Sequence, residues 1–479
     1  MNTPFFPVWR RQFAAWGRRS SSTASKRSPV ELQHHCARFL PPDCLVPGQW
    51  RKGSRDRIFD LSLVFWCFIW QVLQPRTSCR AVVRHVQAFC EIGGRRIDEN
   101  SSAYCQARQR IPLACIQHAL EQSARTADSL VPQGVPGWSR PIKVVDGTSV
   151  QLADTAKNRA RYPYASGQKP GCGFPVMKIL GLYSLASGAI LRTIQALGSA
   201  SDHTLFRQMW PDLLRGDVII GDRAFCSYEA LASLPLQGVD MVCRMHQART
   251  LNPREARKIG PNDWLVSWER PTPCKLKRTM TDQDIAQLPA SITVRIIQVT
   301  VASKGFRTKE LWIATTLLDP VAYPAEQIAY LYLRRWSLEL CFRDLKTTMG
   351  MEVLRCQTPD MVHKELLAFL IAHNFIRCLI AQSAHSHSTP VNRISFKGTV
   401  DASRSFFQAM RLSRSTRHAN LLYRRLLEIL ALDPLPHRPD RREPRAVKRR
   451  PKNFQRLTKP RHLFKECPHR SRYKAPHHA

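Results

Sequence analysis

Four side chains that could hold a phosphodiester stand at fixed spacing in one short stretch of the chain. They are Tyr332, Arg335, Glu339 and Lys346, in the pattern Y-x2-R-x3-E-x6-K. A carboxylate flanked by two cations can hold a divalent metal ion while the arginine and the lysine pair with phosphate oxygens. This order of residues would arise by chance in about one chain in several hundred, so it favours phosphodiester chemistry.

These four residues are predicted to share one face of a single helix, at 325–349. The stretch 332–346 contains no Pro or Gly, and at about 100° per residue the four side chains fall within a stripe about 60° wide. The alternative is an ordinary amphipathic helix in which Arg335 and Glu339 form an ion pair one turn apart. The order of the whole pattern favours the first interpretation.

Two aspartates share a second pattern, because each follows a short apolar run that is predicted to be a strand. Asp146 follows the run at 142–145, and Asp222 follows the run at 217–221. An acid at a strand end is a common position for a site residue, although solvated aspartates are commoner there. With Glu339 they make three carboxylates with no required His or Cys, a set that favours Mg²⁺ or Mn²⁺ over zinc.

The charge of the chain predicts nucleic acid as the partner. Its 479 residues include 73 Lys or Arg against 36 Asp or Glu, which gives a formal net charge of +37 and a pI of about 10.4. Such a balance favours a polyanion over a membrane or an acidic metabolite. A basic ribosomal or chromatin protein would have a similar composition, so the charge indicates a class of partner and no chemistry.

Cysteine spacing and hydropathy argue against a zinc protein and against a membrane protein. The 15 cysteines include no C-x2-C pair, which argues against a zinc site and is typical of small buried side chains in a reducing compartment. The apolar run at 61–73 is about a dozen residues long, short of the roughly 20 that cross a bilayer. We therefore expect no membrane partner and a cytoplasmic, nucleoid-associated protein.

The apolar periodicity predicts an α/β fold with a helical N-terminal part. Residues 31–135 are predicted to be helical throughout, including helices at 57–73 and 78–90. The pattern then changes to three strands, a helix and a strand, at 142–145, 178–185, 189–197, 203–214 and 217–221. A strand-rich insertion at about 247–318 interrupts this order, and long helices are expected at 325–349 and 361–381.

Composition also predicts the boundaries of the parts. Residues 437–479 hold 15 Lys or Arg against 3 acids, with six prolines, so this tail is expected to be disordered until it meets a polyanion. The full division is a disordered basic arm at 1–30, a helical domain at 31–135 that either binds DNA or caps the next domain, an α/β domain with the candidate catalytic residues at 136–385, a C-terminal helical region at 386–436 and the basic tail.

These residues together resemble the DDE transposases of bacterial insertion sequences, in the large branch with a Tyr-Arg-Glu-Lys signature. The resemblance rests on VVDGT around Asp146, GDRAF around Asp222 and the Y-x2-R-x3-E-x6-K run, which stand in the family's order. The gaps of 76 residues between the aspartates and 117 from Asp222 to Glu339 agree with it. Softer support comes from flanking blocks such as SSAYCQARQR at 101–110.

The resemblance implies a ribonuclease-H-like core, interrupted by the β-rich insertion. It implies that Asp146, Asp222 and Glu339 are catalytic and bind two Mg²⁺ or Mn²⁺ ions, while Tyr332, Arg335 and Lys346 bind DNA. The implied reaction is hydrolysis at the ends of the element, followed by transesterification into target DNA. The implied partners are double-stranded transposon-end and target DNA, held by a homodimer.

Two alternatives stay open at this point. A metal-dependent, structure-selective nuclease would cleave without joining strands and would have no use for the Tyr-Arg-Glu-Lys stripe. A domesticated or inactive transposase-derived DNA-binding protein would tolerate the loss of the carboxylates, yet all three are present.

Overall fold

One mixed sheet runs through the molecule in the computed structural model. Its strand order is β3-β2-β1-β4-β5-β9-β8-β7-β6, with the short β10 paired to β1. The described chain comprises residues 31–45, 58–436 and Leu463, without 75, 93–95, 135–137, 165–172, 250–251, 253–255, 273–275, 277–279, 301–309 and 414. Its strands are β1 (Ile142–Leu152), β2 (Val176–Ser184), β3 (Ile190–Leu197), β4 (Val218–Gly221), β5 (Asp240–Arg244), β6 (Arg257–Gly260), β7 (Asp263–Glu269), β8 (Ser291–Thr300), β9 (Glu310–Thr315) and β10 (Val353–Leu354).

The first five strands contain both antiparallel and parallel pairs. β1 runs antiparallel to β2, which runs antiparallel to β3, whereas β1, β4 and β5 are parallel. A tight connection joins β2 to β3, and Gly188 in it has φ +72°, a conformation that glycine adopts without strain. The strand at 142–145 was predicted to end at 146–148, with an extended pattern again at 150–152. This break was wrong: β1 is continuous to Leu152, because its antiparallel pairing with β2 extends well beyond its parallel pairing with β4.

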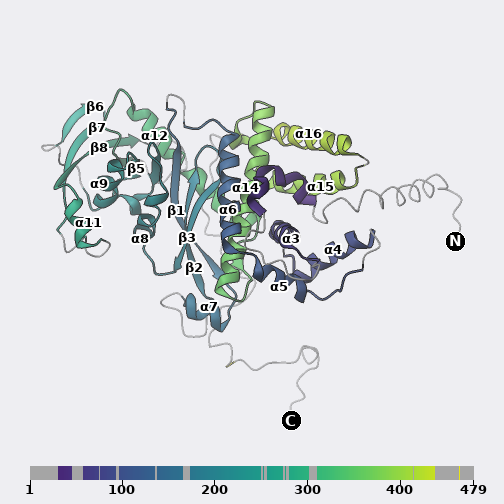
Figure 1. Cartoon of the computed structure of the whole chain (residues 1–479). Coiled ribbons are helices and arrows are strands. Elements are labelled where there is room, and N and C mark those ends of the chain that lie inside the picture. The colour runs from purple at the N-terminus through teal and green to yellow at the C-terminus, as the bar shows by residue number, and fades with distance from the viewer. Residues whose placement is uncertain are drawn as a thin grey trace, which may run out of the picture.

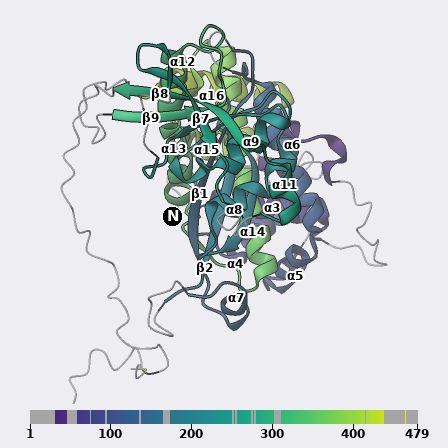
Figure 2. The ribbon, with the colours of Figure 1, turned by 90° about the vertical axis from the view of Figure 1, so that its left-hand side faces the viewer.

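The β-rich insertion extends the central sheet. β9 pairs antiparallel with β5, and β8, β7 and β6 follow in turn at the same edge. Figure 1 shows β8, β7 and β6 beyond β5, on the side away from the N-terminal helices, and Figure 2 shows β7, β8 and β9 side by side. The insertion thus lengthens the central sheet. Its last strand in the chain, β9, is followed by the helices that carry the 332–346 pattern.

Helices cover the two faces of the first strands unequally. Figure 1 shows α8 and α9 on one side, and α6 and α14 on the other with further helices beyond them. The helices are α2 (Glu31–Cys36), α3 (Leu61–Leu73), α4 (Cys79–Ile92), α5 (Ser102–Arg110), α6 (Leu113–Ser129), α7 (Ala156–Arg161), α8 (Asp202–Arg207), α9 (Tyr228–Leu236), α11 (Asp282–Gln287), α12 (Ala325–Leu333), α13 (Trp336–Arg343), α14 (Pro359–Ser386), α15 (Phe396–Arg411) and α16 (Thr416–Leu432).

The long helix α14 organises the thicker side. It packs against α3, α6, α15 and α16, and one continuous core joins these helices to the sheet. By length and composition alone α14 could cross a membrane, but 89% of its apolar window is buried inside the protein. Its hydrophobicity is therefore explained by its place in the core.

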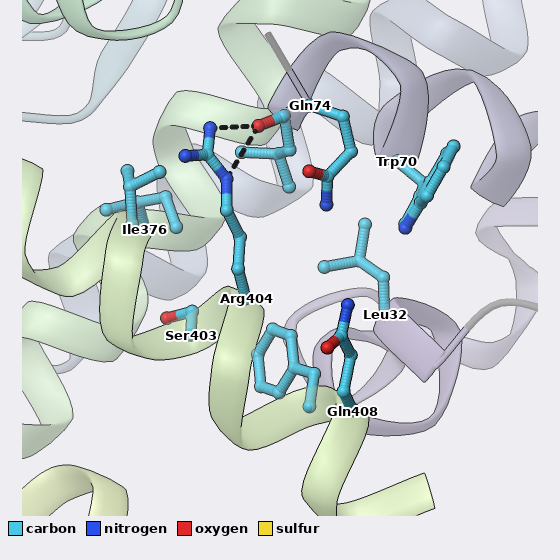
Figure 3. Close-up of a pocket in the computed structure, with 10 residues that line it drawn as sticks. Leu32, Trp70, Gln74, Ile376, Ser403, Arg404 and Gln408 are labelled. Atoms are coloured by element: carbon cyan, nitrogen blue, oxygen red, sulfur yellow. Dashed lines mark hydrogen bonds between the residues drawn. The ribbon is translucent and has the colours of Figure 1, made fainter. Parts of the chain in front are cut away.

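An arginine joins the N-terminal and C-terminal helices beside α14. The side chain of Arg404, on α15, donates from Nε to the carbonyl of Leu73 at 3.0 Å (Figure 3). Leu73 is the last residue of α3, where backbone carbonyls lack helical partners and a cation is favourable. A small cavity lies next to this contact, lined by apolar side chains that include Leu32 and Ile376. The two helical regions are thus packed as one body around α14.

A buried ion pair fixes the insertion to the segment before α12. Arg295 on β8 is completely buried and binds Asp263 on β7 with an Nη2–Oδ2 distance of 2.6 Å. Its Nη1 donates to the carbonyls of Leu317, Asp319 and Tyr323, which lead into α12. Arg295 therefore ties β7 and β8 to the segment that leads into α12.

We expect Asp263→Ala to destabilise the protein by about 3–5 kcal/mol, because it leaves the Arg295 charge buried without its partner. Chemical denaturation should show a clearly lowered midpoint. The matched control is Asp212→Ala, which breaks the half-exposed pair with Arg192 and should change stability by less than about 1 kcal/mol. Equal effects of the two variants would contradict the prediction.

Candidate active site

The two predicted aspartates come together at the end of the parallel strand pair. β1 and β4 pair as Ile142 with Val218 and Val144 with Ile220, an offset of 76 residues. Continued two residues beyond the last pair, the same offset places Asp146 opposite Asp222, which follows the last residue of β4. Neighbouring strands lie about 4.8 Å apart, so the register brings the two carboxylates to adjacent positions.

Both aspartates lie on the sheet face that α12, α13 and α14 cover. Side chains alternate along a strand, so Asp146 shares a face with Val144, and Asp222 shares one with Ile220. Val144 and Ile220 belong to the core on the α14 side, whereas Val145 belongs to the core on the α8 side. The alternation of side chains along each strand therefore places both carboxylates on the face that the elements of the 332–346 pattern cover.

Each aspartate has a glycine neighbour with a packing role. An added Cβ on Gly147 would lie 2.5 Å from Asp202 Oδ1, and one on Gly221 would lie 2.9 Å from Phe225 Cβ. Neither site has space for a larger residue without movement. The DG and GD pairs thus allow close packing on the face opposite the carboxylates.

Backbone amides hold each carboxylate in place. Gly147 N–H donates to Asp146 Oδ1 at 2.8 Å. Ala224 N–H donates to Asp222 Oδ1 at 2.7 Å, since Asp222 caps the short 3-10 helix η4 (Arg223–Phe225). Each contact uses Oδ1 and orients the carboxylate from the backbone.

The single helix predicted at 325–349 is wrong in its continuity. α12 ends at Leu333 and α13 begins at Trp336, with a tight turn between them. Arg334 and Arg335 keep right-handed helical dihedral angles, but Arg335 N–H bonds to the carbonyl of Tyr332, three residues back. The tighter turn changes the angular positions of the following residues, so the simple 60° stripe does not apply.

Arg335 lies at this turn and reaches the first aspartate. Its Nη1 is 3.8 Å from Asp146 Oδ2, and the arginine side chain is 11% exposed. α13 also packs against β1. Glu339 lies on α13 one helical turn after Arg335, but its side chain is outside the described residues, as are those of 336–338. The predicted third carboxylate therefore has its backbone position described and its side-chain contacts undescribed.

The Tyr332 side chain is buried in the core, next to Arg335. It is 3% exposed, and the guanidinium carbon of Arg335 is 6.0 Å from the centre of its ring. Burial raises the pKa of Tyr332 to about 12, and the charge of Arg335 opposes that rise. The phenol is thus a neutral group at physiological pH, packed under Arg335.

Lys346 departs from the others. It lies in the π-helix η5 (Asp344–Thr348), where Met349 N–H bonds to the carbonyl of Asp344, five residues back. Burial lowers the pKa of Lys346, and Glu352 opposes that change. Its side chain lines a large cavity shared with the N-terminal helices. Lys346 thus lies in a widened turn, a feature that is frequent at functional sites.

One arginine outside the sequence pattern supports this segment. Arg377 on α14 donates to Cys341 Sγ at 3.1 Å, and its Nη2 lies 3.7 Å from Asp344 Oδ2. Burial raises the pKa of Asp344, and the charge of Arg377 opposes this effect. Arg377 thus connects α13 and η5 to the core helix. No spacing rule could have found it, because it lies in a long apolar helix far along the chain.

The described donors fit a hard divalent ion in their chemistry. Asp146 and Asp222 supply carboxylate oxygens, the ligands that Mg²⁺ and Mn²⁺ prefer. Within the described residues, no three Asp, Glu, His or Cys side chains form a group that could hold a metal ion. Glu339 is the predicted third ligand and is not among those side chains.

Comparison with known proteins places the chain among transposases. The family model of the transposase DDE domain matches residues 137–375, which include both aspartates and the 332–346 pattern. Transposase InsG for insertion sequence element IS4, from Escherichia coli, is 25% identical over 423 residues, covering 86% of this chain and 91% of that protein.

Two other proteins are also similar. The probable transposase for insertion sequence element IS5377, from Geobacillus stearothermophilus, is 24% identical over 265 residues, covering 54% of this chain and 62% of that protein. Among solved structures, the piggyBac transposase synaptic complex with hairpin DNA has a TM-score of 0.39 and 11% identity, covering 88% of this chain and 85% of that one.

Proposed function

Because this chain belongs to the DDE transposases of insertion sequences, we propose that it cleaves the DNA ends of such an element by phosphodiester hydrolysis and joins them to target DNA by transesterification. The observation that carries the proposal is the register of β1 and β4, which sets Asp146 opposite Asp222 with Arg335 3.8 Å from Asp146. Carboxylates beside a guanidinium suit a phosphate held by metal ions.

The strands β1 to β5 are proposed to be a ribonuclease-H-like core. What supports this is their order, β3-β2-β1-β4-β5, with three antiparallel strands followed by two parallel ones. Asp146 and Asp222 then lie just beyond the last parallel pair of β1 and β4, on the carboxyl side of that pairing, where sites are usual in an open α/β sheet.

Asp146, Asp222 and Glu339 are proposed to hold two Mg²⁺ or Mn²⁺ ions. When bound, such ions would activate a water or 3′-hydroxyl for attack and stabilise the leaving oxygen. The backbone contacts of Asp146 and Asp222 orient these carboxylates before any ion arrives. In this proposal Arg335 leaves Asp146 and pairs with a phosphate oxygen. The ring of Tyr332 packs near the guanidinium and helps to position it.

The proposed partners are the element's ends and a target duplex, bound by a homodimer in the bacterial cytoplasm. Support comes from the net charge of +37 and from the transposase relatives. The helical part at 31–135 is proposed to bind DNA specifically, and Lys346 to contact the strand being cut. The side chains of both regions face a common cavity.

A strand-transfer assay tests the proposal. The purified protein, Mg²⁺ and DNA carrying the element's terminal repeats should yield both nicked ends and joined products when a target plasmid is present. Cleavage without joining, on branched DNA of any sequence, would favour a structure-selective nuclease. Binding without any cleavage would favour a domesticated DNA-binding protein.

The basic tail at 437–479 lies outside the described residues except for Leu463 and is predicted to supply nonspecific electrostatic affinity. Deleting it should flatten the dependence of DNA affinity on salt, because fewer counterions are released on binding. Binding titrations at several salt concentrations measure this slope. If the deletion abolishes assembly of paired ends and leaves the slope unchanged, the tail acts in protein pairing instead.

A further inference from the structure

A cavity of about 1160 Å³ separates the N-terminal helices from the segment that follows α13. One wall is formed by α3, the start of α4 and α5, and the other by η5, β10, the residues that follow β10 and the first part of α14. Small-molecule sites usually have volumes of roughly 300–1,000 Å³. This cavity therefore has room for a segment of a polymer.

The cavity is lined by more positive than negative side chains. Its acidic residues are Glu352 and Glu365, and its basic residues are Arg76, Arg108, Lys346 and Arg355. The buried Glu365 is already engaged, because its carboxylate accepts hydrogen bonds from the backbone N–H groups of Arg355, at 2.9 Å, and Cys356, at 2.8 Å. The field inside the cavity is thus positive and suits an anion.

Several contacts fix Arg108 in the wall that the N-terminal helices form. It lies on α5 and donates from Nη1 to Gln71 Oε1 at 3.1 Å, and the buried Tyr104 donates to the same oxygen at 2.9 Å. Its guanidinium carbon lies 4.7 Å from the ring centre of Phe68 and 5.5 Å from that of Tyr104. A neutral amide and two aromatic rings therefore fix the cation in place.

The charge of Arg108 is not matched by a carboxylate. Among the described residues it donates to Gln71 and lies against two aromatic rings, no ion pair joins it to a carboxylate, and its Nε is buried without a hydrogen-bond partner. A largely buried arginine with open donors is unfavourable unless an anion completes it. Its fork of donors matches the oxygens of a phosphate.

We propose that this cavity binds the sugar-phosphate backbone of a DNA strand and that Arg108 contacts a phosphate there, an inference that rests on the proposed function. The strand would pass from the carboxylates along α13 to Lys346 and then to the N-terminal helices. Thr347 and Thr348, beside Lys346, add hydroxyl donors to the same wall. The helical region and the catalytic region thus share one DNA-binding groove.

Arg108→Gln in the full-length protein tests the inference. We expect roughly 10-fold weaker binding of the element's end, and a slope of log affinity against log salt that falls by about 0.9 for duplex or 0.7 for single-stranded DNA, as for one lost phosphate contact. The matched control is Arg425→Gln, on the exposed face of α16 and paired with Glu428, which should change neither quantity. Wild-type affinity and slope in Arg108→Gln would overturn the inference.

A second measurement avoids any loss of folding in that variant. Cys79 lines the cavity, and its hydrogen bond with Cys105 lowers the pKa of the Cys79 thiol, which favours the thiolate that an alkylating reagent attacks. End DNA should slow alkylation of Cys79 in the wild-type protein by N-ethylmaleimide, measured by peptide mass spectrometry. An unchanged rate at saturating DNA would overturn the inference.

The same preparations separate this inference from the proposed function. If the wild type cleaves and joins DNA but Arg108→Gln binds DNA normally, the proposed function stands and the proposed DNA-binding groove is wrong. Binding that depends on Arg108, with no cleavage by the wild type, would keep the groove and remove the transposase activity. Arg108-dependent protection of Cys79 by a mononucleotide, but not by DNA, would assign the cavity to a small phosphate ligand and overturn the inference.

Discussion

Asp146→Asn and Asp222→Asn are each expected to slow metal-dependent cleavage of the element's end by at least about 10³-fold. The reason is that a carboxylate contributes through the metal ion it holds, and this stabilisation amounts to several kcal/mol of the activation barrier. Glu339→Gln should have the same effect. Rates are measured on end substrates with Mg²⁺ and again with Mn²⁺.

Binding of the same DNA should be largely unchanged in these variants. Carboxylates repel phosphate, so affinity comes from Lys and Arg contacts. Asparagine also keeps the Oδ1 acceptor that receives the backbone N–H of Gly147 or Ala224, so folding should be preserved. Cleavage at the wild-type rate in any one variant would remove that residue from the site.

A neighbouring acid supplies the matched control. Asp202 lies against Gly147, on the face of β1 opposite Asp146, and pairs with Lys178 at 3.0 Å. Asp202→Asn removes one negative charge from the same region and should leave cleavage within about threefold of the wild type. A loss as large as that of Asp146→Asn would show that the effect follows from local charge and not from metal binding.

The sequence predicted the strands of this fold well because their signal is local. Alternating apolar residues and turn glycines identify β2, β3 and β4, and Asp222 is placed by the short apolar run before it. The length of β1 was missed because β2 pairs with it beyond Val145, a long-range contact that no local pattern contains. Asp146 therefore lies in the middle of the pairing of β1 with β2, but two residues beyond the end of the pairing of β1 with β4.

The arrangement around the 332–346 pattern was less predictable. Helical periodicity assumes uniform geometry, but the turn at Arg335 and the π-helix that holds Lys346 both depart from it. The departures depend on tertiary contacts, such as that of Arg377 with Asp344 and Cys341. Arg108 stood within a motif block, yet its role depends on a cavity that only the folded chain forms.

Arg335→Lys is expected to lower end cleavage and joining by about 10- to 100-fold with little change in folding. Arg335 lies 3.8 Å from Asp146, so in the proposed complex it is close to any phosphate held beside that carboxylate. A charged hydrogen bond contributes about 1.5–3 kcal/mol, and lysine cannot reproduce the two parallel bonds of the guanidinium fork. Cleavage of intact and pre-nicked ends, measured with thermal stability, tests this.

The size of the effect distinguishes two roles for Arg335. If it only neutralised Asp146, lysine would preserve the charge and the rate would change by a few-fold at most, because a pair at 3.8 Å with one partly exposed member is weak. The matched control is Arg343→Lys, an exposed arginine at the end of α13, which should retain the wild-type rate. Wild-type rates in both variants would reduce Arg335 to an ion-pair partner. A selective loss in Arg335→Lys, with nonspecific DNA binding unchanged, would identify it as the group that holds the phosphate being cut.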